Sequence, residues 1–197
     1  MQVERIVNSV FSSNTYILQE EGSNDAYLVD VGDIEQILAK GLNIKGVFIT
    51  HGHFDHIYGI KDLIEYYPDC KIYTNAIGRD YLGDVKLNLS KYHGVPVEYH
   101  GDNVIVVAEG DEISILSICK VIVYETPGHN PSCLVFRVGD YLFTGDAYIP
   151  NVKLITNIPK ADKELGLANR NKIKQEFIDL QTIVCAGHGV VMSKDER

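Results

Sequence analysis

The sequence predicts an α/β protein in which two β-sheets pack against each other and helices cover their outer faces. Two observations support this fold class. Apolar runs typical of strands occur early in the chain and again between residues 104 and 145, whereas helical spacing of apolar residues occurs between and after them. A sheet face without a covering layer would stay wet, so sheets and helices must pack in layers. The 197 residues, of ordinary globular composition, are expected to form one domain over 1–197.

The first elements are expected to be a hairpin and a short helix. Strands at 16–18 and 26–31 flank the turn-rich sequence GSND. Asp33 is expected to cap a helix, with Gln36 completing a capping box, and Gly41 is expected to end it.

A buried strand at 46–50, GVFIT, comes next because the run is continuously apolar. Apolar residues at helical spacing then predict a helix over 57–67, which Pro68 ends. Residues 71–75 indicate another strand, and 76–94 a helix plus a loop.

The second half is predicted to consist mostly of strands, at 104–108, 112–118, 120–126, 134–138 and 141–145. A helix is expected over 161–180, where apolar residues recur at roughly helical spacing. These residues are Leu165, Ala168, Ile173 and Phe177. The sequence TIVCAG, at 182–187, predicts a last strand.

Charge and composition argue against several classes of partner. A net charge of −9 disfavours a general nucleic-acid or anionic-membrane surface, since both attract clustered lysine and arginine. No apolar run approaches the length of a transmembrane helix, and no signal peptide is visible in MQVERIVNSV. The four cysteines are scattered without a C-x-x-C motif, which disfavours a disulfide framework. We expect a cytoplasmic protein with a small-molecule substrate, and the oligomeric state stays open.

The stretch 50-THGHFDHIYG-59 concentrates metal-ligand side chains, at His51, His53, Asp55 and His56. If the chain stays extended after the strand, residues 51, 53 and 55 project to one side. His56 is expected to begin the helix and to point into the same space. Imidazole and carboxylate are natural ligands of zinc and also suit iron or manganese. The alternative is a solvated polar turn, which this density of ligands disfavours.

Three later turns offer further ligands. His129 in TPGHNPSC, Asp146 in FTGDAYIP and His188 in IVCAGHGVV each follow an apolar run in a glycine-containing turn. Glycine lets the backbone turn tightly, so that the next side chain can aim inward. Each residue alone also suits an ordinary surface loop, but the threefold repetition predicts a shared metal site.

The motifs HGHFDH, PGHN, TGDA and AGHG, in this order, resemble the ligand motifs of the metallo-β-lactamase superfamily. The resemblance extends from NTYIL and LVDVG near the start to AGHG near the end. It implies an α/β (α+β) fold, a four-layer αββα sandwich, with the site at one edge of the two sheets.

The resemblance also implies two metal ions, each held by three side chains, with one aspartate bridging them. The ligands of the first ion would be His51, His53 and His129. The ligands of the second ion would be Asp55, His56 and His188. The bridge would be Asp146. Asp30 in LVDVG matches an aspartate that supports the ligands by hydrogen bonding, with a plain strand-end turn residue as the alternative.

Two divalent ions would lower the pKa of a shared water, so that a bridging hydroxide becomes the nucleophile. Zn²⁺ is the expected ion, with iron or manganese as alternatives. Asp55 is the expected catalytic residue, because it can orient the water or accept a proton. The expected enzyme is a metal-dependent hydrolase that needs no serine or cysteine nucleophile.

Within the superfamily the chain is most similar to the glyoxalase II-like members, which implies a thioester substrate of the hydroxyacylglutathione type. True β-lactamases lack the bridging aspartate, and di-iron redox members usually carry glutamate where this chain has His53. The chain ends nine residues after His188, without the helical region that holds glutathione in full-length glyoxalase II. One-domain relatives are therefore the better comparison. Phosphoesters, cyclic nucleotides and lactones stay open as substrates, as does a non-hydrolytic iron-dependent redox role.

Candidate substrate contacts are Tyr148, Asn151 and Lys153, which follow the bridging aspartate. Lys153 suits a substrate carboxylate, with a solvated lysine as the alternative. The segment 87-LNLS-90 is similar to a pocket-side loop of glyoxalase II, with an ordinary surface loop as the alternative.

Two of the cysteines, Cys133 and Cys185, lie close in sequence to predicted histidine ligands. They either line the pocket or pack in the core, and packing is the expectation.

Overall fold

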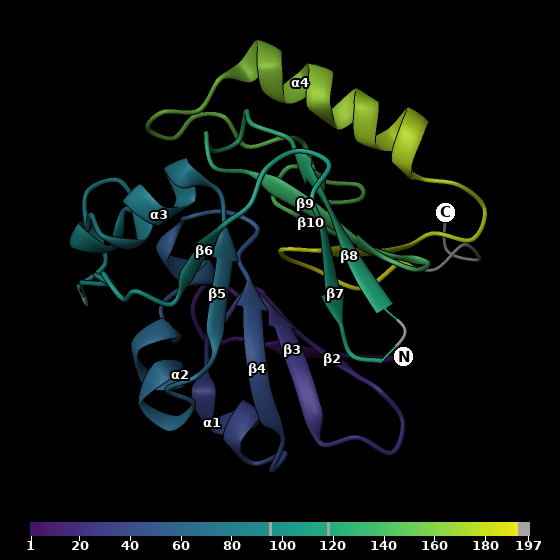
Figure 1. Ribbon diagram of the computed structural model, residues 1–197. Coiled ribbons are helices and arrows are strands. Elements are labelled where there is room, and N and C mark those ends of the chain that lie inside the picture. Colours follow the sequence, from purple (N-terminus) through teal and green to yellow (C-terminus); the bar gives the residue numbers. More distant parts are fainter. Residues whose placement is uncertain (95, 118, 193–197) are drawn as a thin grey trace.

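The computed structural model describes residues 1–94, 96–117 and 119–192, and over these residues the chain forms two sheets that face each other (Figure 1). The first sheet contains, in spatial order, β1 (Gln2–Val7), β2 (Asn14–Gln19), β3 (Asp25–Val29), β4 (Asn43–Phe48), β5 (Lys71–Thr74) and β6 (Val104–Val106). The second contains β11 (Ile183–Ala186), β10 (Tyr141–Gly145), β9 (Leu134–Val138), β8 (Cys119–Glu125) and β7 (Glu112–Ile115). Strands β3 to β6 pair in parallel, and so do β10 and β11.

Helices lie on the outer sides of both sheets. In Figure 1, α1, α2 and α3 lie to one side of the first sheet, whereas α4 lies over β9 and β10. Their bounds are α1 (Ile34–Leu38), α2 (Ile60–Tyr66), α3 (Ala76–Leu82) and α4 (Lys163–Lys172). A π-helical turn over Ile173–Phe177 continues α4.

Three apolar clusters fill the three interfaces between these layers. In the outer interface of the first sheet, Ile37 of α1 and Ile60 and Leu63 of α2 pack with Leu28 and Ile44 of the strands. All five side chains are almost completely buried. Removing apolar surface of this kind from water is the main term that stabilises such a fold.

The interface between the two sheets is rich in aromatic rings. Phe48 of β4 meets Phe136 of β9 edge-on, with ring centroids 5.3 Å apart. Tyr16 of β2 meets Phe143 of β10 in the same manner at 5.4 Å. Edge-to-face pairs at such separations are favourable beyond the area that they bury.

The outer interface of the second sheet is smaller. Val135 of β9 and Leu142 of β10 pack with Ile173 and Phe177, which lie just after α4. Together the three interfaces confirm the four-layer αββα sandwich, with the order helix, sheet, sheet, helix.

Most of the predicted elements are present with shifted ends. The hairpin of β2 and β3 is antiparallel as expected, and α2 ends before Pro68. The predicted strand at 112–118 ends at Ile115, and residue 118 lies outside the described residues. The edge strand β1 was not anticipated, because its residues are mostly half-buried or exposed and carry little apolar signal. None of the described helices is both long and apolar enough to cross a membrane.

The capping box predicted for α1 is wrong. Asp33 precedes the helix, but its side chain makes no capping hydrogen bond. Its carboxylate instead accepts hydrogen bonds from Ser9 N and Oγ, both at 2.7 Å, and from the Tyr58 hydroxyl at 2.6 Å. These three donors come from other parts of the chain, so tertiary partners have replaced the local cap.

The face predicted for the helix at 161–180 is also partly wrong. Leu165 and Ala168 are exposed, whereas Ile173 and Phe177 are buried as expected. Helix α4 turns Gly166 toward the protein, where a Cβ built on Gly128 would lie 2.1 Å from the Gly166 Cα. This backbone contact sets the rotation of the helix, and glycine gives it no apolar signal.

Candidate metal centre

The ends of several strands deliver the predicted ligands to one edge of the two sheets. The segment after β4 carries His51, His53, Asp55 and His56. Asp146 directly follows β10, and His188 lies two residues beyond β11. Because β10 and β11 are parallel neighbours, their carboxyl ends meet at the same edge. His129 lies in the loop between β8 and β9.

Of the two courses open to the chain after the strand, extended or turning, the structure shows a turn from Phe54 onward, whereas His53 itself is extended. Strand β4 ends at Phe48, and Phe54–His56 forms one 3₁₀ turn. Phe54 is buried, and its amide donates to Asn88 O at 2.9 Å, which anchors the turn. The turn places Asp55 and His56 next to each other, with Asp55 Oδ2 at 3.4 Å from His56 Nε2.

Within the described residues, three groups of side chains have ligand atoms that all lie within 4.8 Å of one another. One group is His51, His53 and His129. Another is Asp55, His56 and His188. These two equal the sets implied by the resemblance. The third group is His51, His56 and Asp146. Asp146 thus joins one member of each set, which is the position that a bridging ligand needs.

The donor atoms suit divalent metal ions. His51 Nε2, His56 Nε2 and Asp146 Oδ1 are buried and have no hydrogen-bond partner among the described residues. Burying a polar atom without a partner costs about 1–3 kcal/mol, so three such atoms in one cluster need an explanation. Coordination of a metal ion by these lone pairs removes that cost.

Asp30 holds one of these histidines in place. Its Oδ2 lies 2.8 Å from His56 Nδ1, and its two oxygens accept from Thr50 N and Oγ1, each at 2.7 Å. A proton on Nδ1 of His56 leaves Nε2 as the free donor atom, which is the arrangement typical of a metal-ligating histidine. Asp30 also adopts a φ of 56°, a left-handed conformation that aspartate tolerates better than most residues.

Backbone and amide groups orient the other imidazoles. His129 Nδ1 lies 2.9 Å from Ile155 O, and His188 Nδ1 lies 3.2 Å from Phe11 O. A carbonyl only accepts, so both Nδ1 atoms carry the proton. The Nε2 atoms face other predicted ligands: His129 Nε2 lies 3.1 Å from His53 Nδ1, and His188 Nε2 lies 3.3 Å from Asp55 Oδ2. Asn130 Nδ2 approaches His53 Nε2 at 2.9 Å on the side away from His129.

Two histidines are held neutral. Burial lowers the pKa of His51 well below its ordinary value, and the neighbouring histidines His56 and His53 lower it further. Burial and then His129 lower the pKa of His53 to about 3. Neutral imidazole is the form that binds metal ions, so both side chains are ready to coordinate.

In the group of Asp55, His56 and His188, charged neighbours shift the pKa values so that the ionised forms are favoured. Burial alone would raise the pKa of Asp55, but His56 and His188 outweigh it and hold the carboxyl below its usual range. Burial alone would lower the pKa of His56, but Asp55 and Asp30 raise it to about 10. The metal-free group therefore pairs a carboxylate with an imidazolium, and a metal ion would replace that proton.

Comparison with known proteins agrees with this geometry. A sequence model described as "Metallo-beta-lactamase superfamily" matches residues 8–188. The chain belongs to the metallo-β-lactamase superfamily. Its clusters of histidine and aspartate are typical of the dinuclear sites of that superfamily. The findings support a superfamily hydrolase with a histidine-rich metal site.

Several curated relatives carry a functional name. A hydroxyacylglutathione hydrolase of Xylella fastidiosa (strain 9a5c) is 30% identical over 171 residues, 85% of this chain and 57% of that protein. One of Francisella philomiragia is 34% identical over 154 residues, 74% of this chain and 52% of that protein. The chain thus spans about half the length of these relatives. A Mycobacterium bovis protein named as uncharacterized is 28% identical over 198 residues, and the match covers 91% of this chain and 87% of that protein.

Solved structures share the fold. BLEG-1, described as a B3 metallo-beta-lactamase, superimposes with a TM-score of 0.85 at 24% identity, covering 99% of this chain and 95% of that one. TTHA1623, described in a di-iron-bound form, superimposes with a TM-score of 0.80 at 23% identity, covering 98% and 95%.

In this chain, a cavity of about 450 Å³ opens over the candidate metal centre. Five of the predicted ligands contribute to its lining: His53, Asp55, His129, Asp146 and His188. Its walls are mostly apolar, with Phe11, Phe54, Leu89, Ile149, Val152, Ile155 and Ile158. A concave apolar pocket with a few convergent polar groups is the usual form of a small-molecule site.

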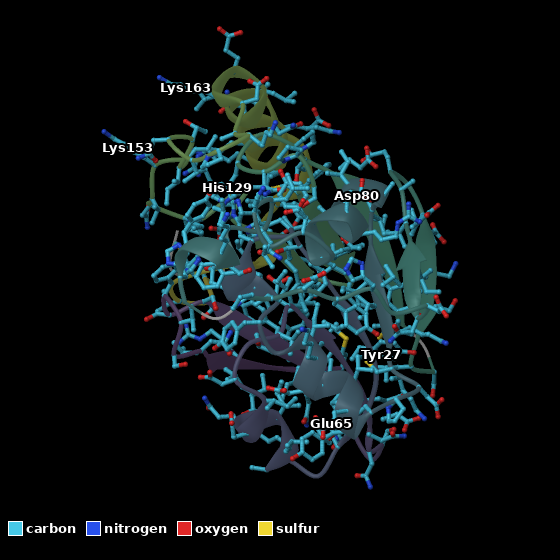
Figure 2. All side chains as sticks on the ribbon, turned by 90° about the vertical axis from the view of Figure 1, so that its left-hand side faces the viewer. Tyr27, Glu65, Asp80, His129, Lys153 and Lys163 are labelled. Atoms are coloured by element: carbon cyan, nitrogen blue, oxygen red, sulfur yellow. The ribbon has the colours of Figure 1, made fainter. Side chains whose placement is uncertain are left out.

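The candidate substrate contacts lie outside the lining of this cavity. The Tyr148 ring lies under the Arg170 guanidinium, 4.9 Å from ring centroid to Cζ. Asn151 and Lys153 line a separate cavity of about 440 Å³ against α4. Lys153 also borders a narrow recess beside His129 and Asp146. Figure 2 shows Lys153 at the periphery of the molecule, extending away from His129. The predicted contact with substrate stays a prediction.

Leu89 of the segment 87–90 lines the cavity, as a pocket-side loop predicts. Cys133 and Cys185 are buried in the core and do not line the cavity, and burial raises the pKa of both thiols. Two residues near the site, Phe11 and Asn130, were not predicted from the sequence. No motif marks Phe11, and only its position directly after His129 singles out Asn130.

Proposed function

We propose that this chain is a dinuclear metal-dependent hydrolase that cleaves thioesters of the hydroxyacylglutathione type. The observation that carries the proposal is the pair of three-ligand groups joined through Asp146 at the floor of a cavity. The named function of the relatives at about 30% identity supports the thioester as the bond that is cleaved.

The proposed metal ligands are His51, His53, His129, Asp55, His56, His188 and Asp146. Zn²⁺ is the first ion to test, and iron and manganese accept the same donors. Two such ions, when bound, lower the pKa of a shared water and polarise the oxygen of the bond to be cleaved.

The protein's own groups then orient and accept protons. Asp55 remains a carboxylate at neutral pH, so it acts as an acceptor and not as a general acid. It is proposed to orient the attacking water and take up its proton. The water oxygen bonds to the thioester carbon, the carbon–sulfur bond breaks, and the thiolate leaves with the bonding pair. A thiolate is a stable leaving group at neutral pH, so the mechanism requires no acid at the sulfur.

Hydrolysis of S-lactoylglutathione by the zinc-loaded protein tests the proposal. We expect turnover that disappears in His53→Ala, with metal content reduced and the fold retained by circular dichroism. The matched control is His100→Ala, an exposed histidine paired with Glu98 and remote from the ligand groups. Turnover that survives both a chelator and His53→Ala would refute the metal mechanism.

The same assay separates the alternatives. If metal-loaded protein leaves thioesters intact but cleaves a phosphoester, cyclic nucleotide or lactone, the hydrolase remains and the substrate changes. If only iron-loaded protein is active and consumes oxygen without hydrolysis, the protein has a redox function and the proposal is wrong.

A further inference from the structure

We infer that the cavity over the metal centre binds the acyl part of the substrate, and that among glutathione thioesters it prefers an apolar acyl chain to a short hydroxyacyl group such as lactoyl. This inference rests on the proposed function, since it names the acyl class that the thioesterase prefers. It concerns what the cavity walls select, whereas the metal ligands decide what bond is cleaved.

The first argument is the chemistry of the lining. Apart from the metal ligands at the floor, the described lining consists of seven apolar side chains, Gly189 and His93. No lysine or arginine contributes to it over the described residues. Glutathione carries two carboxylates and an ammonium group, and these charges would lose hydration in such a cavity without gaining a partner. The acyl group is therefore the part that enters.

The second argument is where the nearby cations lie. Lys153 and Lys163 line the separate cavity against α4. In Figure 2 both side chains lie at the outer edge of the molecule, above and to the left of His129. Arg170 is engaged with backbone carbonyls: it donates to Ile149 O at 3.2 Å and to Val152 O at 2.6 Å. Lys153 and Arg170 border the narrow recess beside His129 and Asp146, but neither contributes to the lining of the 450 Å³ cavity, whose wall stays apolar.

The third argument is that both walls are held in place before a ligand binds. Arg170 fixes the loop that carries Ile149 and Val152, and His129 is fixed to Ile155 O of the same loop. On the opposite side Phe11 meets Phe54 edge-on at 5.5 Å. A preformed apolar pocket binds a chain without a large cost of ordering its walls.

The fourth argument is exposure. Phe11, Val152 and Ile155 remain 59%, 42% and 43% exposed although they line the cavity. An apolar chain would cover them and gain the free energy of removing that surface from water. A lactoyl group has only three carbons and a hydroxyl, so it would leave most of a 450 Å³ cavity without contacts.

The experiment keeps glutathione constant and changes only the acyl group. S-acetyl-, S-lactoyl- and S-octanoylglutathione are compared below the micellar concentration of the octanoyl compound. We expect kcat/KM for the octanoyl thioester to exceed that of both others by at least about tenfold, as burial of several methylene groups implies. An equal or lower value for the octanoyl thioester overturns the inference.

A charged side chain introduced by mutation into the apolar wall of the cavity provides a matched comparison. Val152→Asp places a carboxylate in the cavity at a position exposed enough to be tolerated, and we expect the octanoyl-to-acetyl ratio to fall by about tenfold. Leu180→Asp makes the same change at a side chain that is 85% exposed and outside the cavity lining, and it should leave the ratio unchanged. An unchanged ratio in Val152→Asp also overturns the inference.

A binding measurement separates failure of the inference from failure of the proposed function. Acetohydroxamate and octanohydroxamate chelate metal ions through the same head group and differ only in the chain. We expect the octanoyl compound to bind the zinc-loaded protein at least about tenfold more tightly, and Val152→Asp to remove this preference. If no thioester is cleaved but the preference holds, the proposed function fails and the apolar cavity stands. If thioesters are cleaved without any preference, the function stands and the inference fails.

Discussion

At the scale of single residues, Asp30 orients His56, which belongs to the ligand group of Asp55, His56 and His188. It is almost completely buried, and it contacts His56 and Thr50 through both oxygens. Burial raises the pKa of Asp30, and His56 opposes that rise, so each side chain of the pair depends on the other. A neutral amide in its place would keep the shape but lose this charge.

We predict that Asp30→Asn weakens metal binding by about 10- to 100-fold, the usual effect of changing a group that hydrogen-bonds a ligating histidine. Asparagine tolerates the left-handed φ of 56°, so the fold should persist. Competition with a chromophoric chelator measures the affinity. Asp33→Asn is the control, because Asp33 also accepts three hydrogen bonds but from Ser9 and Tyr58. Equal losses in both variants would contradict the role given to Asp30.

The protonation of His56 determines how metal binding should depend on pH. Its raised pKa of about 10 means that the metal-free protein carries a proton there at neutral pH. A metal ion must displace that proton, so affinity should rise with pH below the pKa, by about tenfold per pH unit for one proton. Calorimetric titration in two buffers of different ionisation enthalpy counts the protons released. Zero protons released at neutral pH would contradict the charge pattern of the cluster.

At the scale of elements, the parallel ends of β10 and β11 hold Asp146 and His188 side by side. Gly187 directly precedes His188, and its amide donates a hydrogen bond to Gly145 O, next to Asp146, at 2.9 Å. A Cβ built on Gly187 would lie 2.3 Å from Asp146 Oδ1 and 2.8 Å from His56 Cε1. The position of the Asp146 carboxylate therefore depends on a residue without a side chain.

Gly187→Ala should weaken metal binding by at least about tenfold, although it removes no ligand, because Asp146 must move. We also expect a loss of about 1–3 kcal/mol in the free energy of unfolding, as for other overpacked sites. Metal content after gel filtration and chemical denaturation measure the two effects. Gly83→Ala is the control, since the three atoms nearest to its Cβ would all belong to the exposed ring of His100. Full metal content in Gly187→Ala would argue against the tight packing of this strand end.

The elements also show what could be predicted from the sequence and what could not. Each ligand motif follows an apolar run, and strand ends meet at one edge, so the convergence of His129, Asp146 and His188 followed from local patterns. The cavity wall did not, because Phe11 and Ile155 lie in irregular loops and look like ordinary core residues. The rotation of α4 was missed because Gly166 provides the contact, and glycine has no hydrophobic signal.

At the scale of the whole molecule, the ligands join the two halves of the sandwich. His51, His53, Asp55 and His56 follow a strand of the first sheet. His129, Asp146 and His188 come from the loops of the second sheet. A metal ion bound by both sets links the sheets in the folded state only, so its binding free energy adds to the stability of the fold.

We predict that removing metal lowers the melting temperature by about 5 °C or more. Free metal at about 100 times its Kd stabilises by roughly 2.7 kcal/mol, and about 1 kcal/mol shifts a domain of this size by some 2–4 °C. Differential scanning calorimetry of zinc-loaded and chelator-treated protein measures the shift. Equal melting temperatures would mean that the ligand groups do not bind metal in the folded protein.

In the proposed function, two metal ions act together in hydrolysis. The most direct measurement titrates metal-free protein with Zn²⁺ while cleavage of a glutathione thioester is followed. We expect activity to rise until two equivalents are bound and then to stay constant. Full activity in the chelator-treated protein, or no activity at two equivalents with both ions verified in the protein, would contradict a mechanism that uses two metal ions.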